Sequence, residues 1–257
     1  NNIVSRERLQ VSIQAMKEIF PPNTLRLPLL TSSVQTSFSP EDPETMFRMM
    51  YRAYALTPLL MAACNTLSGF VVNEDKKIDY LPRAKYYLGY GRAGGISEAF
   101  LKAANGKELI NNHIQAVFDA PMHFYYDLQG NIFPASTENP VTFRDLIKTG
   151  LNTLSNYEAA ESFLYNDVKI CNLRDDDGNV IGKRLEVRGA DSGIDTPVMA
   201  VLMTAAIVPD GSGADAFMAL LKEYGFTGTP AQDAALLQSA RTAVVDHNGK
   251  FMDVGFG

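Results

Sequence analysis

Tryptophan is absent from this chain of 257 residues, and cysteine occurs only as Cys64 and Cys171. Two cysteines are too few for a disulfide framework, and no Cys-x-x-Cys pair or Cys/His cluster predicts a zinc site. We therefore expect a reducing, cytoplasmic setting. The only histidines, His113, His123 and His247, are widely spaced, so a histidine-based catalytic triad is not indicated.

The sequence also lacks long apolar runs and an excess of basic residues. No apolar run reaches the roughly 18 residues that a membrane span needs, and the N-terminus does not resemble a signal peptide. A net charge of -6 argues against nucleic-acid binding but permits a locally basic site for small anions. With 46% hydrophobic residues, we expect residues 1–257 to form a single catalytic-type domain, cut from a longer chain because the first residue is not Met and the end is abrupt.

The expected secondary structure mixes helices with strands. Apolar periodicity and capping residues predict helices over residues 6–19, 43–67 (with a kink or restart at Pro58), 96–102, 107–118, 146–151, 157–165, 198–208, 215–224 and 230–245. Alternating polarity predicts strands over residues 25–39, 121–127, 168–174 and 180–188, and the turn at 175–179 joins the last two strands as a hairpin. Because strands and helices do not alternate regularly, we expect an α+β fold with an antiparallel sheet.

A basic, tyrosine-rich loop is expected over residues 80–95. Gly89, Gly91 and Gly94 match the spacing Gly-x-Gly-x-x-Gly, but no Val/Ile-rich parallel strand precedes them and the next segment is helical, which argues against a dinucleotide-binding unit. The cations of this loop, which include Arg83, suit an anionic ligand. The alternative is a solvated loop whose long side chains lie along the surface.

The most informative stretch is the strand that ends at Gly189. A period of two places Arg184, Glu186 and Arg188 on one face and Lys183 with the intervening apolar residues on the other. One interpretation is an exposed antiparallel strand with alternating charges. The other is an anion site in which Glu186 holds a divalent cation and Arg188 binds a carboxylate or phosphate beside it.

Several ordered motifs resemble glutamate–cysteine ligases (γ-glutamylcysteine synthetases) of the plant and proteobacterial branch. Residues 184–191, Arg-Leu-Glu-Val-Arg-Gly-Ala-Asp, are similar to a Leu-Glu-Met-Arg-Gly-Ala-Asp run in that family. The other similar stretches are residues 33–38, 55–58, 121–124 and 142–144, and Leu88-Gly89-Tyr90 after Arg83. Together they extend over about residues 26–210, and they favour the anion-site interpretation of the strand.

The resemblance implies an antiparallel sheet that forms a funnel with helices packed outside, as in the glutamine synthetase fold. It implies ligation of the γ-carboxylate of L-glutamate to the amine of L-cysteine through γ-glutamyl phosphate, with ATP and Mg2+, as the first step of glutathione biosynthesis. The residues it assigns to the site are Arg188 as the catalytic residue at the transferring phosphoryl group or substrate carboxylate, Glu186 as a metal ligand, Arg83 at the carboxylate of glutamate, and Gln35, Ser37 and Tyr90 near the substrates.

Departures from the family leave alternatives open. Ser37 stands where the family usually has Asn, and the loop after Arg83 differs from the plant pattern, so the amine acceptor is not fixed. The family's N-terminal segment supplies most of its metal-binding glutamates, and none precedes residue 26. We therefore expect either a fragment of a longer chain or a chain that needs a separate segment to supply these ligands. The alternatives are a ligase of the same fold with another amine acceptor, and a non-catalytic module that binds an amino acid or nucleotide without the full metal site.

Overall fold

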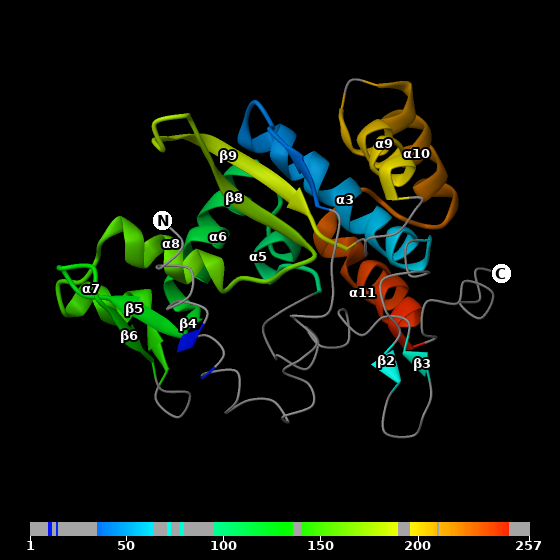
Figure 1. Cartoon of the computed structure of the whole chain (residues 1–257). Coiled ribbons are helices and arrows are strands. Elements are labelled where there is room, and N and C mark those ends of the chain that lie inside the picture. The colour runs from blue at the N-terminus through cyan, green and yellow to red at the C-terminus, as the bar shows by residue number, and fades with distance from the viewer. Residues whose placement is uncertain are drawn as a thin grey trace.

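The computed structural model describes residues 10–11, 14, 35–63, 71–72, 78–79, 95–135, 140–189, 196–209 and 211–246. Helices and short antiparallel strands are mixed in these ranges, which confirms the α+β class (Figure 1). The elements are β1 (Thr36–Phe38), α3 (Pro43–Ala63), β2 (Val71–Val72), β3 (Ile78–Asp79), α5 (Glu98–Leu101), α6 (Gly106–Asp119), β4 (Pro121–Met122), β5 (Phe124–Tyr126), β6 (Ile132–Pro134), β7 (Val141–Thr142), α7 (Phe143–Lys148), α8 (Leu154–Ser162), β8 (Val168–Arg174), β9 (Val180–Val187), α9 (Thr196–Ile207), α10 (Ser212–Glu223) and α11 (Pro230–Asp246).

The main sheet has three antiparallel strands in the order β1-β9-β8. Strands β8 and β9 form the predicted hairpin, and its turn is closed by hydrogen bonds between Asp175 and Asn179. Strand β1 pairs with the other side of β9. Strand β9 therefore lies in the middle of this sheet, whereas the first interpretation of the sequence made it an exposed strand.

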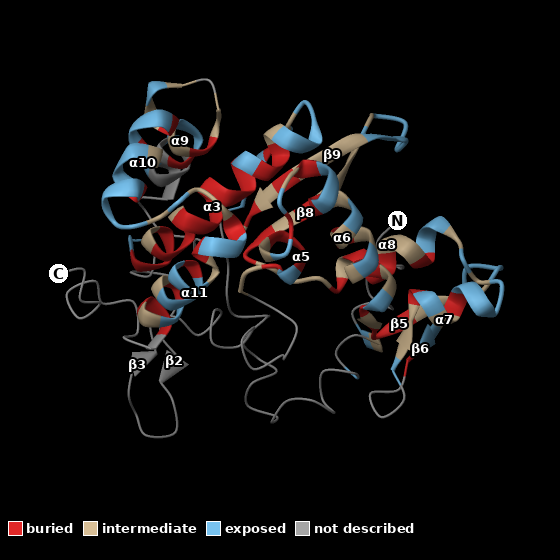
Figure 2. Ribbon diagram, turned by 180° about the vertical axis from the view of Figure 1, so that it is seen from behind, coloured by how far each residue is buried: buried red, intermediate tan, exposed pale blue. Residues whose placement is uncertain are grey.

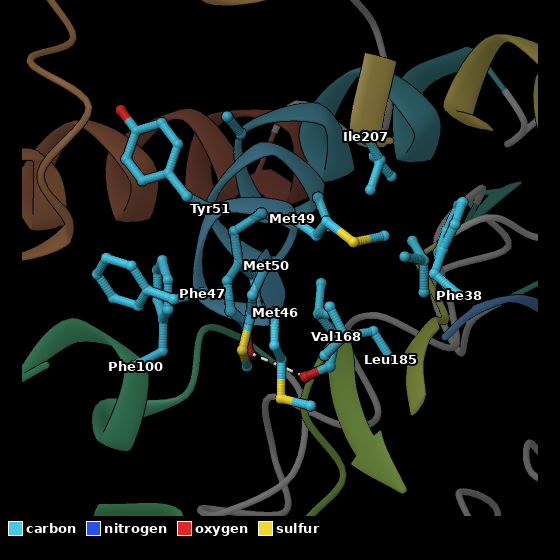
Figure 3. Packing of buried hydrophobic residues seen from close by; sticks show 14 of the residues in the cluster. Phe38, Met46, Phe47, Met49, Met50, Tyr51, Phe100, Val168, Leu185 and Ile207 are labelled. Carbon is cyan, nitrogen blue, oxygen red and sulfur yellow. Dashed lines mark hydrogen bonds between the residues drawn. The ribbon is translucent and has the colours of Figure 1, made fainter. Parts of the chain in front are cut away.

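Helix α3 forms the centre of the core. Its apolar side chains cover one face of the main sheet, and Pro58 lies within the helix. In Figure 3, Phe47 lies beside Phe100 of α5 on one side of α3, while Phe38 and Leu185 of the sheet lie on the other side. A single hydrophobic cluster therefore joins α3, α5 and all three strands of the main sheet.

A buried tyrosine connects the helix to the start of β8. The hydroxyl of Tyr54 donates a hydrogen bond to the carbonyl of Val168 (3.0 Å) and accepts one from the backbone N–H of Ser97 (3.0 Å). Burial raises the pKa of Tyr54, so this hydroxyl stays protonated and keeps its donor. Satisfying these groups inside the core fixes the position of β8 against α3.

Smaller units flank this core on both sides. Helices α9 and α10 lie side by side, and α9 packs against α3, whereas α7, α8 and the β5–β6 pair lie on the far side of α6 (Figure 1). Figure 2 shows that buried residues concentrate on α3, whereas the hairpin strands are mostly intermediate and the outer faces of α10 and α11 are exposed. Among the described residues, no helix is long and apolar enough to cross a membrane.

The agreement with the predicted elements is uneven. Helices α6, α9, α10 and α11 and the hairpin lie within a few residues of their predicted bounds. The single strand predicted over residues 121–127 is wrong: it is divided into β4, which pairs with β7, and β5, which pairs with β6. The helix predicted at 157–165 begins and ends earlier, as α8. Most of the segments predicted at 6–19 and 80–95 lie outside the described residues.

Helices α3 and α6 meet at a glycine. A Cβ on Gly106 would lie 2.1 Å from the carbonyl oxygen of Pro43, and the Gly106 N–H donates to Glu44 at 2.9 Å. We expect Gly106→Ala to lower the free energy of unfolding by about 1–3 kcal/mol or more, because rigid backbone has to move. Gly182→Ala, whose nearest contact would be 4.0 Å, is the matched control. Urea denaturation measures both, and equal stability of the two variants would contradict this close approach.

A neutral histidine lies beside a separate apolar cluster, which includes Val117, Phe124 and Phe163. His123 is buried, its ring centroid lies 4.5 Å from that of Phe163, and burial lowers its pKa from 6.5 to about 4. Between these pH values the unfolded chain binds a proton that the folded chain does not, so acidification should reduce the free energy of unfolding by roughly 3 kcal/mol. Denaturant titrations across this range should show that His123→Phe removes this part of the pH dependence. An unchanged slope in the variant would exclude His123 as its source.

Candidate functional site

Arg184 and Glu186 of β9, together with Arg188 just after it, lie on the side of the sheet that faces away from α3. Leu185 and Val187 are buried under α3, so alternation directs Glu186 to the opposite side. Cross-strand pairing then places Ser37, Glu186 and Lys169 in one row across all three strands. We define the polar face as this row together with its neighbours Tyr165, Cys171, Arg184 and Arg188.

Glu186 lies between two arginines. Its Oε2 is 3.4 Å from Nη2 of Arg184, and its Oε1 is 3.2 Å from Nε of Arg188. Nη1 of Arg184 also donates to the hydroxyl of Ser37 at 3.0 Å. Side-chain exposure is 37% for Arg184 but only 13% for Glu186 and 18% for Arg188. The Glu186–Arg188 pair is therefore shielded from water, which strengthens its electrostatic interactions.

Lys169 adds a further cation to the polar face. Its Nζ donates to the carbonyl of Ser162 at 3.3 Å, and burial together with the charge of Arg188 lowers its pKa. Within the part of the polar face that the structure describes, three cations thus lie around the carboxylate of Glu186. Such an arrangement suits an anionic ligand, because guanidinium and ammonium groups donate charge-assisted hydrogen bonds to carboxylate and phosphate.

A buried network holds the backbone at Arg188. Its N–H donates to the carbonyl of Asp167 at 2.8 Å. The carboxylate of Asp167 forms a buried ion pair with Arg241 of α11 and accepts a hydrogen bond from the N–H of Gly95 at 3.2 Å. The end of β9 is therefore connected to the start of β8, to α11 and to Gly95, which follows the predicted loop.

The residue after Arg188 touches α3 directly. A Cβ on Gly189 would lie 2.7 Å from Cγ2 of Thr57, and the Thr57 hydroxyl is bonded to the carbonyl of Ala53 at 2.7 Å. That bond fixes the Thr57 side chain, so it cannot easily turn away. Two of the stretches that carry the family resemblance, residues 55–58 and 184–191, are thus in contact at this point.

The described residues do not by themselves fit a site for several Mg2+ ions. No group of three or more His, Cys, Asp or Glu side chains suited to a metal occurs in the described part of the chain. Mg2+ prefers octahedral oxygen ligands, usually one or two carboxylates completed by phosphate oxygens and water. Glu186 offers one carboxylate, which already pairs with Arg184 and Arg188. We therefore derive no reaction step through a metal.

The structure brings together part of the predicted site. Ser37, Glu186 and Arg188 lie on or beside the polar face, and Gln35 immediately precedes β1 and is exposed. Arg83 and Tyr90 lie outside the described residues. The contributions of Lys169 and Tyr165 were missed. The predicted hairpin, which has no bulge, would pair Lys169 with Leu185. The register shift between Leu173 and Arg174 places Lys169 opposite Glu186 instead, so no sequence signal indicated Lys169 or Tyr165.

A scan against protein-family models and a search of curated proteins both find no match to this chain.

Contact between Gly189 and Thr57 predicts a compensating pair of mutations. Gly189→Ala should lower the free energy of unfolding by about 1–3 kcal/mol because the added methyl group overlaps Thr57. Adding Thr57→Ala removes the overlapping Cγ2 and should recover most of this loss, although it also removes a buried hydrogen bond worth about 1 kcal/mol. Thermal melts of the wild type, both single variants and the double variant measure the coupling. Strictly additive losses would show that the two positions do not interact.

Proposed function

We propose that the polar face is part of the substrate site of an ATP-dependent ligase that joins the γ-carboxylate of L-glutamate to the amine of L-cysteine through γ-glutamyl phosphate. The observation that carries the proposal is the meeting of two separate motifs. Ser37, from the stretch at residues 33–38, lies opposite Glu186 and accepts a hydrogen bond from Arg184, both from the stretch at residues 184–191.

The chemistry of these side chains suits this reaction. Phosphoryl transfer depends on positioning and on stabilising negative charge, which cationic groups supply. Arg188 would bind the transferring phosphoryl group or a substrate carboxylate, and Glu186 would hold the guanidiniums of Arg188 and Arg184 in place through contacts at both of its oxygens. Mg2+, when bound, would neutralise phosphate charge, with Glu186 as one ligand and further carboxylates from outside the described residues.

The wider site would be a funnel over the antiparallel sheet with helices outside, as in the glutamine synthetase fold. In this proposal Gln35 and Ser37 contact substrate from β1 and its start, Arg83 binds the carboxylate of glutamate, and Tyr90 contributes to the acceptor pocket. Gly95 supports this placement, because it comes soon after Arg83 and Tyr90 in the sequence. Its N–H donates a hydrogen bond to Asp167, whose carbonyl accepts the N–H of Arg188.

Release of ADP by the full chain, with ATP, Mg2+, glutamate and cysteine and with each omitted in turn, tests the proposal. We expect turnover to require both amino acids. Arg188→Met should lower kcat/KM by about 10²- to 10³-fold, the typical effect of removing one group that stabilises transition-state charge. Glu186→Gln should abolish ATP use and leave the fold intact. Arg48→Met, which replaces an exposed arginine of α3 that donates to the hydroxyl of Thr45, is the control, and normal turnover by the Arg188 and Glu186 variants would refute these roles.

A second candidate is a non-catalytic module that binds an anionic amino acid or nucleotide. It is favoured by the single carboxylate that the described polar face offers to a metal. Calorimetric titration with ATP separates the candidates: the ligase requires Mg2+ for productive ATP binding, whereas the module binds ATP equally well without it. If turnover occurs with glutamate but not cysteine, a panel of amines identifies another acceptor.

A further inference from the structure

Lys169 and Lys183 belong to the same hairpin but occupy different electrostatic environments. Lys183 donates to the carboxylate of Glu161 at 3.0 Å and to the side chain of Asn172 at 2.7 Å. Lys169, on the opposite face, donates to a neutral carbonyl oxygen, that of Ser162. Within the described ranges, no carboxylate lies within 4.0 Å of the Lys169 ammonium.

This arrangement has an energetic cost for the folded chain. Lys169 is half-buried, and burial disfavours its charged form even though the charges of Glu161 and Glu186 act in the opposite direction. The lowered pKa of Lys169, caused first by burial, has the same origin. A bound anion would relieve this cost, because it would supply the opposite charge that the described residues do not provide at close range.

Arg188 approaches the same place from the neighbouring strand. The ammonium of Lys169 and the guanidinium of Arg188 each lie 5.9 Å from the centroid of the Tyr165 ring. Among the described residues, Glu186 contacts Arg184 and Arg188 but does not lie within 4.0 Å of the Lys169 ammonium.

We propose that Lys169 is a ligand-binding residue that, together with Arg188, holds an anionic phosphoryl group on the polar face beside Tyr165. The identification of the anion as a phosphoryl group rests on the proposed function, while the binding itself is measurable without turnover. The bound phosphoryl group would pair with the Lys169 ammonium, which no carboxylate of the described residues contacts.

The competing explanation is structural. Ser162 is the last residue of α8, and a cation near the C-terminus of a helix stabilises its unpaired carbonyl groups. The two explanations predict opposite effects of Lys169→Met, which keeps the length of the side chain but removes its charge. A helix-stabilising lysine would lose thermal stability on replacement. A ligand-binding lysine would leave Tm unchanged or raise it, while anion binding is lost.

The experiment titrates inorganic pyrophosphate into the full chain by calorimetry at fixed ionic strength, with nitrate as the monoanionic comparison. We expect the wild type to bind pyrophosphate and not nitrate, Lys169→Met to bind it at least about tenfold more weakly, and Lys169→Arg to retain most of the affinity. Lys183→Met is the matched control: it should lower Tm by removing the pair with Glu161 and leave pyrophosphate binding unchanged.

Three results would overturn the proposal: no pyrophosphate binding by the wild type, equal binding by Lys169→Met, or a fall in Tm of Lys169→Met without a change in affinity. The ADP-release assay separates this proposal from the ligase proposal. Lys169-dependent binding without glutamate-dependent turnover would refute the ligase and leave the anion site standing. Normal turnover with an unchanged KM for ATP in Lys169→Met would refute the role of Lys169 and leave the ligase standing.

Discussion

The burial of the hairpin's apolar face under α3 is the interaction on which the rest of the structure depends. Val168, Ile170, Leu185 and Val187 are each at most 2% exposed. Burial of such side chains contributes roughly 1.5–3 kcal/mol each, as an upper estimate. A slip of the hairpin by one residue would lose this contribution and turn the charged side chains into the core. The apolar face therefore fixes the register, and the register determines which charged groups meet on the polar face.

Further contacts fix how the end of β9 lies on the helix. The absence of a side chain at Gly189 lets the chain approach Thr57 closely, while Tyr54 holds the start of β8 and Asp167 holds the N–H of Arg188. These contacts are buried and have defined partners, so Arg188 projects from a rigid base. A binding residue positioned in this way loses little conformational freedom when a ligand is bound.

Local signals in the sequence explain which elements could be predicted. The hairpin was predicted to within a residue because the alternation in both strands and the turn at Asp175–Asn179 indicate the same structure. The region around His123 was predicted wrongly, because its two short strands pair with β7 and β6, and such pairings are not encoded in local polarity.

The candidate site shows the same division between local and long-range information. Alternation alone predicts that Arg184, Glu186 and Arg188 share a face, and the structure confirms it for this strand. By contrast, the ion pair of Asp167 with Arg241 joins residues 74 positions apart. No sequence pattern indicates that these two residues pair. The ion pair that holds the backbone at Arg188 could therefore not be predicted and is seen only in the structure. The roles of Arg83 and Tyr90 stay predictions.

The two sides of the hairpin also show how this chain treats buried charge. On one side, burial alone would raise the pKa of Glu161, but the hydrogen bond with His113 and the charge of Lys183 lower it, so the cluster is internally compensated. On the polar face, Glu186 contacts Arg184 and Arg188, whereas no carboxylate of the described residues lies within 4.0 Å of the Lys169 ammonium. Burial lowers the pKa of Lys169 although the charges of Glu161 and Glu186 raise it, so the folded chain holds this cation at a cost. The proposed role of Lys169 as a ligand-binding residue would explain this cost, because stability is often given up for affinity at binding sites.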